Sequence, residues 1–148
     1  MDPTDRALVD LLRADARIAN STLAARVGIA PSTCHARVRA LVERGVVRGF
    51  HASLDPGEMG RPLQAMVAVR LRVHARANLR QFAVRMAGLP GVLNVFFLAG
   101  SDDFQVHVAM TGSDELRDFV ADNLSTNPEV AMTETHLIFE HLTGAGPL

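Results

Sequence analysis

The stretch GIAPSTCHARVRALVERGVV, residues 28–47, decides how the first part of the chain folds. Gly28 is suited to end a helix, Pro31 fits the first turn of the next one, and Gly45 is suited to cap that helix at its C-terminal end. The spacing i, i+4, i+7 and i+8 predicts one apolar face, formed by Cys34, Val38, Leu41 and Val42. The stretch therefore predicts a short helix between two turns.

The residues before this stretch predict two further helices. Asp2 and Pro3 match the N-cap and first position of a helix, and its inner positions repeat at helical spacing as Leu8, Leu11 and Leu12. Asn20-Ser21 is predicted to cap a second short helix, which ends at Gly28. Two short helices joined by a glycine-containing turn form a helix-turn-helix, predicted here for residues 21–44.

The outer face of the third predicted helix carries polar and basic residues. The net charge of the chain is −1, yet residues 16–54 hold six arginines and a single acid, Glu43. Short hydroxyls and an imidazole at a helix start can approach base edges, and arginines can reach guanine or phosphate. The predicted DNA contacts are Ser32, Thr33, His35, Arg37, Arg39, Arg44 and Arg48. A solvated arginine face on a plain three-helix unit is the alternative.

A short hairpin is expected after the third helix. Val46, Val47 and Phe50 are predicted to form a strand, and Asp55-Pro56-Gly57 to form a turn. Such a hairpin over residues 45–60 would be a wing, with Arg48 and His51 near the DNA backbone. We therefore assign residues 1–61 to a winged helix-turn-helix DNA-binding domain.

The remaining residues, 62–148, are predicted to form an α+β domain with the order β-α-β-β-α-β, which is the ferredoxin-like pattern. Alternating apolar residues predict strands over 64–73, 91–100, 104–110 and 130–142. Helices are predicted over 75–87 and from Ser113, which is expected to be an N-cap; the second helix has an apolar stripe of Leu116, Phe119, Val120 and Leu124.

Two helices can cover only one face of a four-stranded sheet. Apolar runs such as VFFL and LIF leave the other face in need of a cover, which a second copy of the chain would supply. We therefore expect a homodimer, with tetramers or octamers as further assemblies. A dimer of this kind would read two half-sites about 34 Å apart on double-stranded DNA.

The sequence resembles the Lrp/AsnC (feast/famine) family of transcriptional regulators over almost the whole chain. The resemblance is carried by the Pro31-Ser32 start, Arg37, Leu41, Glu43, Gly45-Val46-Val47, Gly49-Phe50 and the LAGSDDF run. It implies a C-terminal RAM-type domain that dimerises and senses an amino acid or related small molecule. The effector residues that it implies are Gly100, Ser101, Asp102, Asp103, Thr133 and Thr135. Ala99 and Glu134 depart from the family pattern, which commonly has a hydroxyl and a basic residue there.

Other classes of function find little support. Cys34 is the single cysteine, the six histidines lack zinc-site spacing, and no phosphate loop or Ser-His-Asp spacing stands out. No signal peptide or membrane span is expected, and a cytoplasmic protein without a resident cofactor or metal fits best. The favoured function is an effector-responsive DNA-binding regulator. A ligand-independent DNA-organising protein, or a ferredoxin-like dimeric enzyme such as a decarboxylase, are the alternatives.

Overall fold

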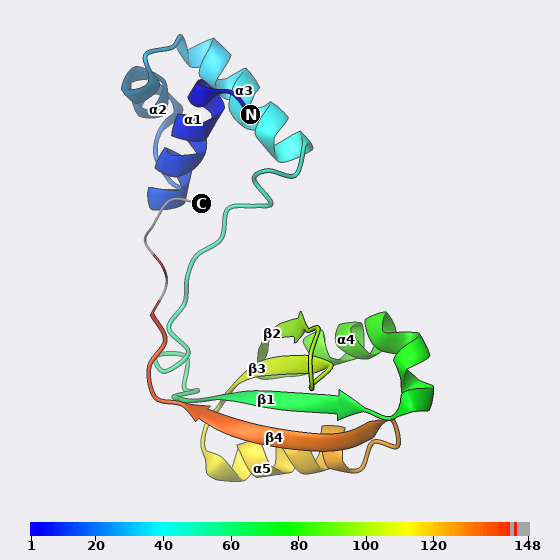
Figure 1. Ribbon diagram of the computed structural model, residues 1–148. Coiled ribbons are helices and arrows are strands. Elements are labelled where there is room, and N and C mark those ends of the chain that lie inside the picture. Colours follow the sequence, from blue (N-terminus) through cyan, green and yellow to red (C-terminus); the bar gives the residue numbers. More distant parts are fainter. Residues whose placement is uncertain (143, 145–148) are drawn as a thin grey trace. The chain divides into compact units, whose positions relative to one another are not determined.

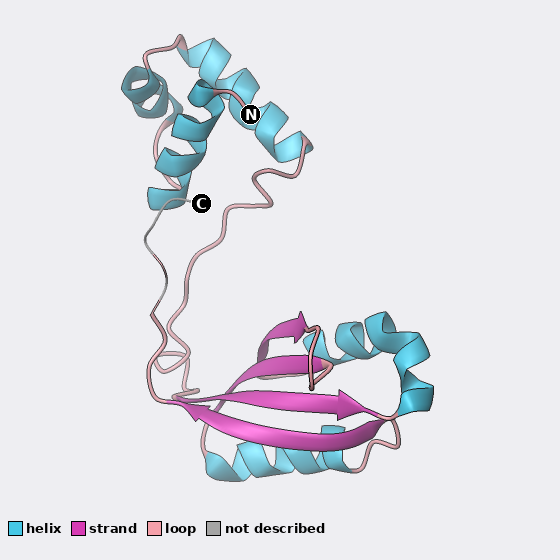
Figure 2. Ribbon diagram, viewed as in Figure 1, coloured by secondary structure: helices cyan, strands magenta, loops and turns pink. Residues whose placement is uncertain are grey.

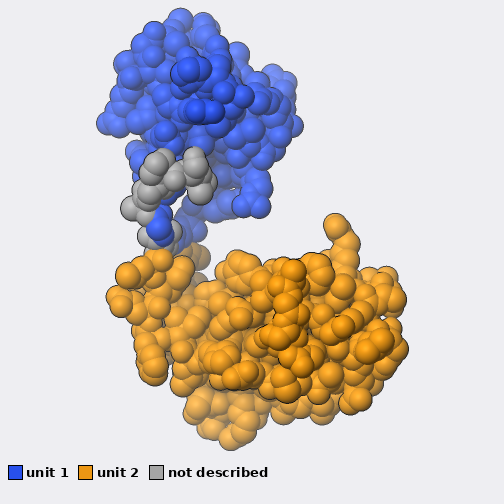
Figure 3. All heavy atoms as spheres, viewed as in Figure 1, with its two compact units in different colours: residues 1–53, 144–148 blue, residues 54–143 orange. Residues whose placement is uncertain are grey.

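The computed structural model describes residues 1–142 and 144. The chain divides into two compact units, one built from residues 1–53 with residue 144 and the other from residues 54–142, which Figure 3 shows in separate colours. Each unit has a hydrophobic cluster of its own. We therefore describe them separately, as the N-terminal and C-terminal modules.

The N-terminal module begins with the predicted helices α1 (Pro3–Ala14) and α2 (Asn20–Val27). The carboxylate of Asp2 caps α1 by accepting a hydrogen bond of 2.7 Å from the Asp5 backbone N–H, as expected. The predicted cap of α2 was wrong, because Ala19 occupies the N-cap position. Asn20 is already helical, and its side-chain amide donates to the carbonyl of Pro31 at 2.9 Å. This bond ties the start of α2 to the start of the next helix.

Helix α3 spans Pro31–Glu43, and Gly45 follows its C-cap Arg44 in the left-handed conformation with φ of 71°. The core of the module consists of Leu8, Leu12, Leu23, Ala24, Cys34 and Leu41. The prediction that Val42 also faces inward was wrong, since Val42 is 41% exposed. Adjacent helical residues point about 100° apart, so with Leu41 buried its neighbour turns toward solvent.

The strand predicted at Val46–Phe50 is not formed in the structure, where residues 46–62 contain turns and bends but no strand. The backbone N–H groups of Val46 and Val47 both donate to the carbonyl of Leu41, at 2.9 and 3.1 Å, so they close the end of α3. A hairpin without further partners is also marginal in water. The predicted turn is confirmed, because the Asp55 carboxylate accepts from the Gly57 N–H at 2.7 Å.

The C-terminal module has the predicted β-α-β-β-α-β order (Figures 1 and 2). Its antiparallel sheet has the strand order β2-β3-β1-β4. The strands are β1 (Leu63–Leu71), β2 (Val92–Phe97), β3 (Phe104–Met110) and β4 (Val130–Ile138). The helical segments are the 3-10 turn η1 (Val73–Asn78), α4 (Leu79–Ala87), α5 (Ser113–Val120) and the π-helical turn η2 (Ala121–Ser125).

Three local predictions for this module were wrong. Gly112, not Ser113, is the N-cap of α5. The first crossover helix begins as a 3-10 turn rather than as an α-helix, and Val73 in that turn is 84% exposed because β1 has already ended at Leu71. The last strand ends at Ile138 instead of continuing to residue 142.

Both helices of this module contribute to one core on one face of the sheet. Phe82 and Met86 of α4, together with Leu116 and Phe119 of α5, belong to the same buried cluster as the inner side chains of β1 and β3. Within the described residues, the opposite face of the sheet carries no helix. Because strand side chains alternate, this open face holds Met66, Ala68, Arg70, Phe96, His107, Met132, Glu134 and His136.

Candidate DNA-binding surface and effector loop

The first turns of α3 present short polar side chains to solvent. Ser32, Thr33 and His35 are all exposed, and Ser32 and Thr33 lie in the first turn, where the backbone N–H groups have no partner within the helix. This end of a helix carries a partial positive charge that attracts phosphate. Neither Ala30 at the N-cap nor any other side chain caps it within the described residues. The arrangement suits contact with a nucleic-acid duplex.

Arg39 lies on the same outer face, two turns further along α3. Its side chain is 75% exposed, and its Nε is 2.8 Å from a carboxylate oxygen of Glu43. An exposed i,i+4 pair of this kind is held by only a few tenths of a kcal/mol, roughly 0.3–0.5. Arg39 is therefore free to exchange Glu43 for a base or a phosphate.

Arg37 and Arg44 form ion pairs with acidic residues at the start of α1. One guanidinium nitrogen of Arg37 lies 2.6 Å from Asp2 and 2.8 Å from Asp5, and Arg44 lies 3.6 Å from the other oxygen of Asp5. Asp5 is nearly buried, with 11% of its side chain exposed. Hydrogen bonds to Asp2 and then to Asp5 raise the pKa of Arg37. The two arginines thus fasten α3 to α1.

Residues Gly100–Asp103 form the connection between β2 and β3 and are tied to the end of β1. The backbone N–H of Asp103 donates to the carbonyl of Val69 at 3.0 Å. The Asp103 carboxylate accepts from the backbone N–H of Leu71 at 2.8 Å and lies 3.4 Å from the Nε of Arg76. The loop is therefore anchored, and the acid that the family resemblance points to is engaged within the chain.

Asp102, the neighbouring acid, faces a basic residue that sequence reasoning missed. One carboxylate oxygen of Asp102 lies 3.7 Å from a terminal nitrogen of Arg70 on β1. The Nε of Arg70 is buried and has no hydrogen-bond partner among the described residues. The alternation of QAMVAVRLRV placed Arg70 on the polar side of its strand, but no sequence signal showed that the β2–β3 loop would reach it.

Thr133 and Thr135 lie on β4, on the helix-covered side of the sheet. They pair in register with Val69 and Val67, whose side chains belong to the core. Thr135 also lines a groove with residues of α5. Glu134, between them, pairs with Ala68 and faces the open side. The structure thus places these threonines two strands away from the loop at Gly100–Asp103, with β1 between.

The histidines form no metal centre in the described part of the chain, where no group of three or more His, Cys, Asp or Glu could hold an ion. His107 is 8% exposed, and its ring nitrogens lie 3.0 Å from the Gln64 oxygen and 3.3 Å from the Asn94 amide nitrogen. Burial lowers the pKa of His107. No helix among the described residues has the length and apolarity that a bilayer crossing requires.

Two family models match the chain, one to each module. The model "Winged helix-turn-helix DNA-binding" matches residues 1–48, and the model "Lrp/AsnC ligand binding domain" matches residues 64–147, more than half of the chain. These assignments agree with the helix-turn-helix and with the four-stranded sheet described above.

Relatives align over the whole length. The transcriptional regulator AldR of Mycobacterium tuberculosis is 51% identical over 100% of this chain and 83% of its own. The leucine-responsive regulatory protein of Rhizobium meliloti is 34% identical over 98% of this chain and 93% of its own. A Neisseria meningitidis transcriptional regulator solved in complex with L-Met superposes with a TM-score of 0.88 at 29% identity, covering 100% of this chain and 96% of its own. The chain is a member of the Lrp/AsnC family of helix-turn-helix transcriptional regulators.

Proposed function

We propose that the outer face of α3 reads duplex DNA and that the C-terminal module pairs two chains and binds an amino-acid effector. Residues 1–61 would be the DNA-binding domain, and residues 62–148 the domain for dimerisation and effector binding. The observation that carries the proposal is the exposed, uncapped start of α3 with Ser32, Thr33 and His35 on it.

The proposed base contacts are Ser32, Thr33, His35 and Arg39, because these side chains are exposed and share the N-terminal half and outer face of α3. Residues near the start of a recognition helix are the ones that reach base edges in the major groove. Arg48 is exposed beyond the end of α3 and is proposed to contact phosphate. Arg37 and Arg44 are proposed to act mainly by holding α3 on α1, since both are paired with Asp5.

The open face of the sheet supports the proposed dimer. Phe96 and Met132 on this face are 46% and 47% exposed, and Phe97, Leu137 and Phe139 add further exposed apolar surface to the module. Exposed apolar side chains on a sheet face without a helix are suited to packing against another chain. A second copy packing on this face would present two α3 helices to half-sites about one helical turn, roughly 34 Å, apart.

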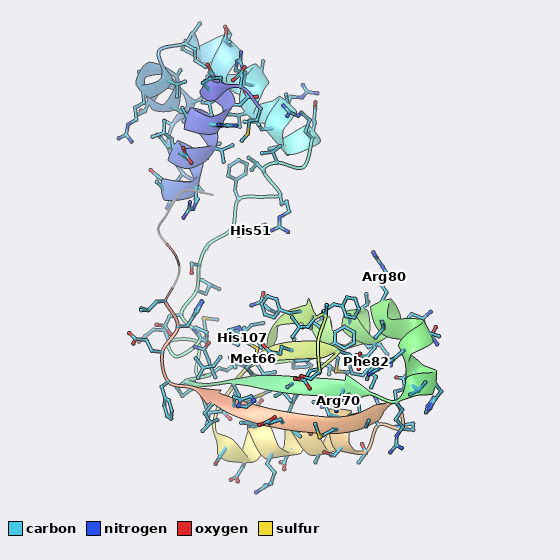
Figure 4. The ribbon with its side chains drawn as sticks, in the orientation of Figure 1. His51, Met66, Arg70, Arg80, Phe82 and His107 are labelled. Atoms are coloured by element: carbon cyan, nitrogen blue, oxygen red, sulfur yellow. The ribbon has the colours of Figure 1, made fainter. Side chains whose placement is uncertain are left out.

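Arg39→Ala is expected to weaken binding to the specific operator by about 1–3 kcal/mol, because a bidentate contact to a base edge would be lost. The measurement is fluorescence anisotropy with operator and scrambled duplexes. Arg80→Ala is the charge-matched control. Arg80 lies on α4 of the C-terminal module, where its side chain is exposed and points away from the sheet (Figure 4). If operator preference is unchanged in Arg39→Ala, Arg39 does not read a base.

An amino acid is expected to bind the C-terminal module, and operator DNA is expected to change its affinity by the same factor by which the amino acid changes DNA affinity. Calorimetric titration of the twenty standard amino acids, with and without operator DNA, measures both. Equal effector affinity in the two conditions would show that no coupling exists. Binding of DNA without any amino-acid binding would instead indicate a DNA-organising protein.

A further inference from the structure

The Gly100–Asp103 loop contains two adjacent acids with different surroundings. Asp103 has one carboxylate oxygen on the backbone N–H of Leu71 and the other beside Arg76, and 15% of its side chain is exposed. An incoming ammonium group would have to compete with both partners. Asp103 therefore serves to hold the loop on β1 and is poorly placed to bind a ligand.

Asp102 and Arg70, by contrast, form a loose pair. Their closest oxygen and nitrogen are 3.7 Å apart, which is longer than a charge-assisted hydrogen bond of about 2.7–2.9 Å. The two side chains are 27% and 39% exposed, respectively, in the single chain, so its own residues do not close the space around them. The Nε of Arg70 is buried without an acceptor among the described residues. A buried donor of this kind costs free energy until an acceptor is supplied.

Such a pair is complementary to a zwitterion. A guanidinium presents a planar set of donors that matches a carboxylate, and a carboxylate accepts from an ammonium group. An α-amino acid carries both charges on one carbon, so it could insert between Arg70 and Asp102 and bond to both. The internal pair would be replaced by two charge-assisted contacts. The space beside the Gly100 backbone is open, because a Cβ atom placed there would meet no atom within 4 Å.

Resting on the amino-acid effector proposed above, we infer that Arg70 and Asp102, rather than Asp103, bind the carboxylate and the ammonium group of that effector. The surroundings restrict its side chain. Met132 on the neighbouring strand β4 pairs in register with Arg70. Ala68 lies two residues before Arg70 on β1, on the same open face (Figure 4 labels Arg70 and Met66 on this strand). Glu134 pairs with Ala68 and would repel an acid. The site therefore takes a zwitterionic amino acid whose side chain is not acidic.

The test uses the full-length protein and the amino acid, among the standard twenty, that binds it most tightly in calorimetry. Arg70→Gln and Asp102→Asn are each expected to weaken binding about 10- to 100-fold, which corresponds to a lost hydrogen bond to a charged group. Arg72→Gln, an exposed arginine two residues further along the chain, is the matched control and should bind as the wild type does.

Ligand analogues assign each charge to its partner. The carboxamide of the same amino acid should bind weakly and equally to wild type and Arg70→Gln, and the des-amino acid should bind weakly and equally to wild type and Asp102→Asn. The inference is overturned if the amino acid binds Arg70→Gln and Asp102→Asn as tightly as wild type, or if only Asp103→Asn loses binding. If no amino acid binds the wild type at all, the effector proposal itself fails, and this inference fails with it.

Discussion

Leu41→Ala is expected to unfold the N-terminal module and abolish DNA binding while the C-terminal module stays folded. Leu41 is 0% exposed, and the core that it belongs to has six buried residues among those described. A buried Leu→Ala change costs about 2–5 kcal/mol, because the apolar contacts are lost and a cavity is left behind. A module of this size has a total stability of about 3–8 kcal/mol, so most of it would be removed.

Thermal unfolding followed by circular dichroism, together with operator binding, measures this effect. Two transitions are expected in the wild type, and in Leu41→Ala only the one that belongs to the N-terminal module should fall to a much lower temperature or disappear. Val42→Ala is the control, because Val42 neighbours Leu41 in α3 but is 41% exposed. Val42→Ala should have the melting profile of the wild type and the same affinity for the operator. An unchanged melting profile in Leu41→Ala would contradict the proposed core.

Phe104→Ala is expected to lower the unfolding free energy of the C-terminal module by about 3–5 kcal/mol. Phe104 is 1% exposed, and its ring centroid lies 5.2 Å from that of Phe82 and 5.3 Å from that of Phe97. It follows Asp103 directly, so its loss should also loosen the effector loop. Specific DNA binding should weaken as well, because the pairing of two α3 helices depends on this module in the proposed dimer.

Chemical denaturation and analytical ultracentrifugation measure this second effect. Phe97→Ala removes a ring of the same size from a site that is 63% exposed, so it should lower the unfolding free energy of the C-terminal module clearly less than Phe104→Ala does. The transition of the N-terminal module should be unaffected in both variants, because that module has a hydrophobic core of its own. A shift of both transitions in Phe104→Ala would mean that the two modules unfold as one unit.

The elements that could be predicted from sequence are those with a local signal. Pro31 and Gly45 mark the ends of α3 through the backbone conformations that they favour, and strand alternation marks the inner residues of β1 and β3. The helix caps failed at Asn20 and Ser113 by one residue each, because the preceding residue can take the cap position without a side-chain bond. Helix termini are the least sharply defined part of any helix.

The relations that could not be predicted join segments far apart in the chain. Arg37 is predicted to contact DNA, and the sequence did not indicate that its guanidinium also pairs with Asp2 and Asp5 at the start of α1. Arg70 meets Asp102 only because β1 and the β2–β3 loop come together in the folded sheet. The expected wing strand is absent from residues 46–62 because the backbone donors of Val46 and Val47 close α3 instead. The residue pattern within one segment does not indicate which residues of a distant segment it will contact.

The measurement that tests the central claim most directly is the affinity of the full-length protein for a duplex from its own promoter region as salt is raised. If Arg48 of each of two chains neutralises one phosphate, the affinity should fall at least about 10-fold between 50 and 200 mM salt. The logarithm of the affinity should fall linearly with the logarithm of the salt concentration. No binding at the lowest ionic strength, or an affinity that does not change with salt, would contradict the role of α3 as a DNA-reading helix.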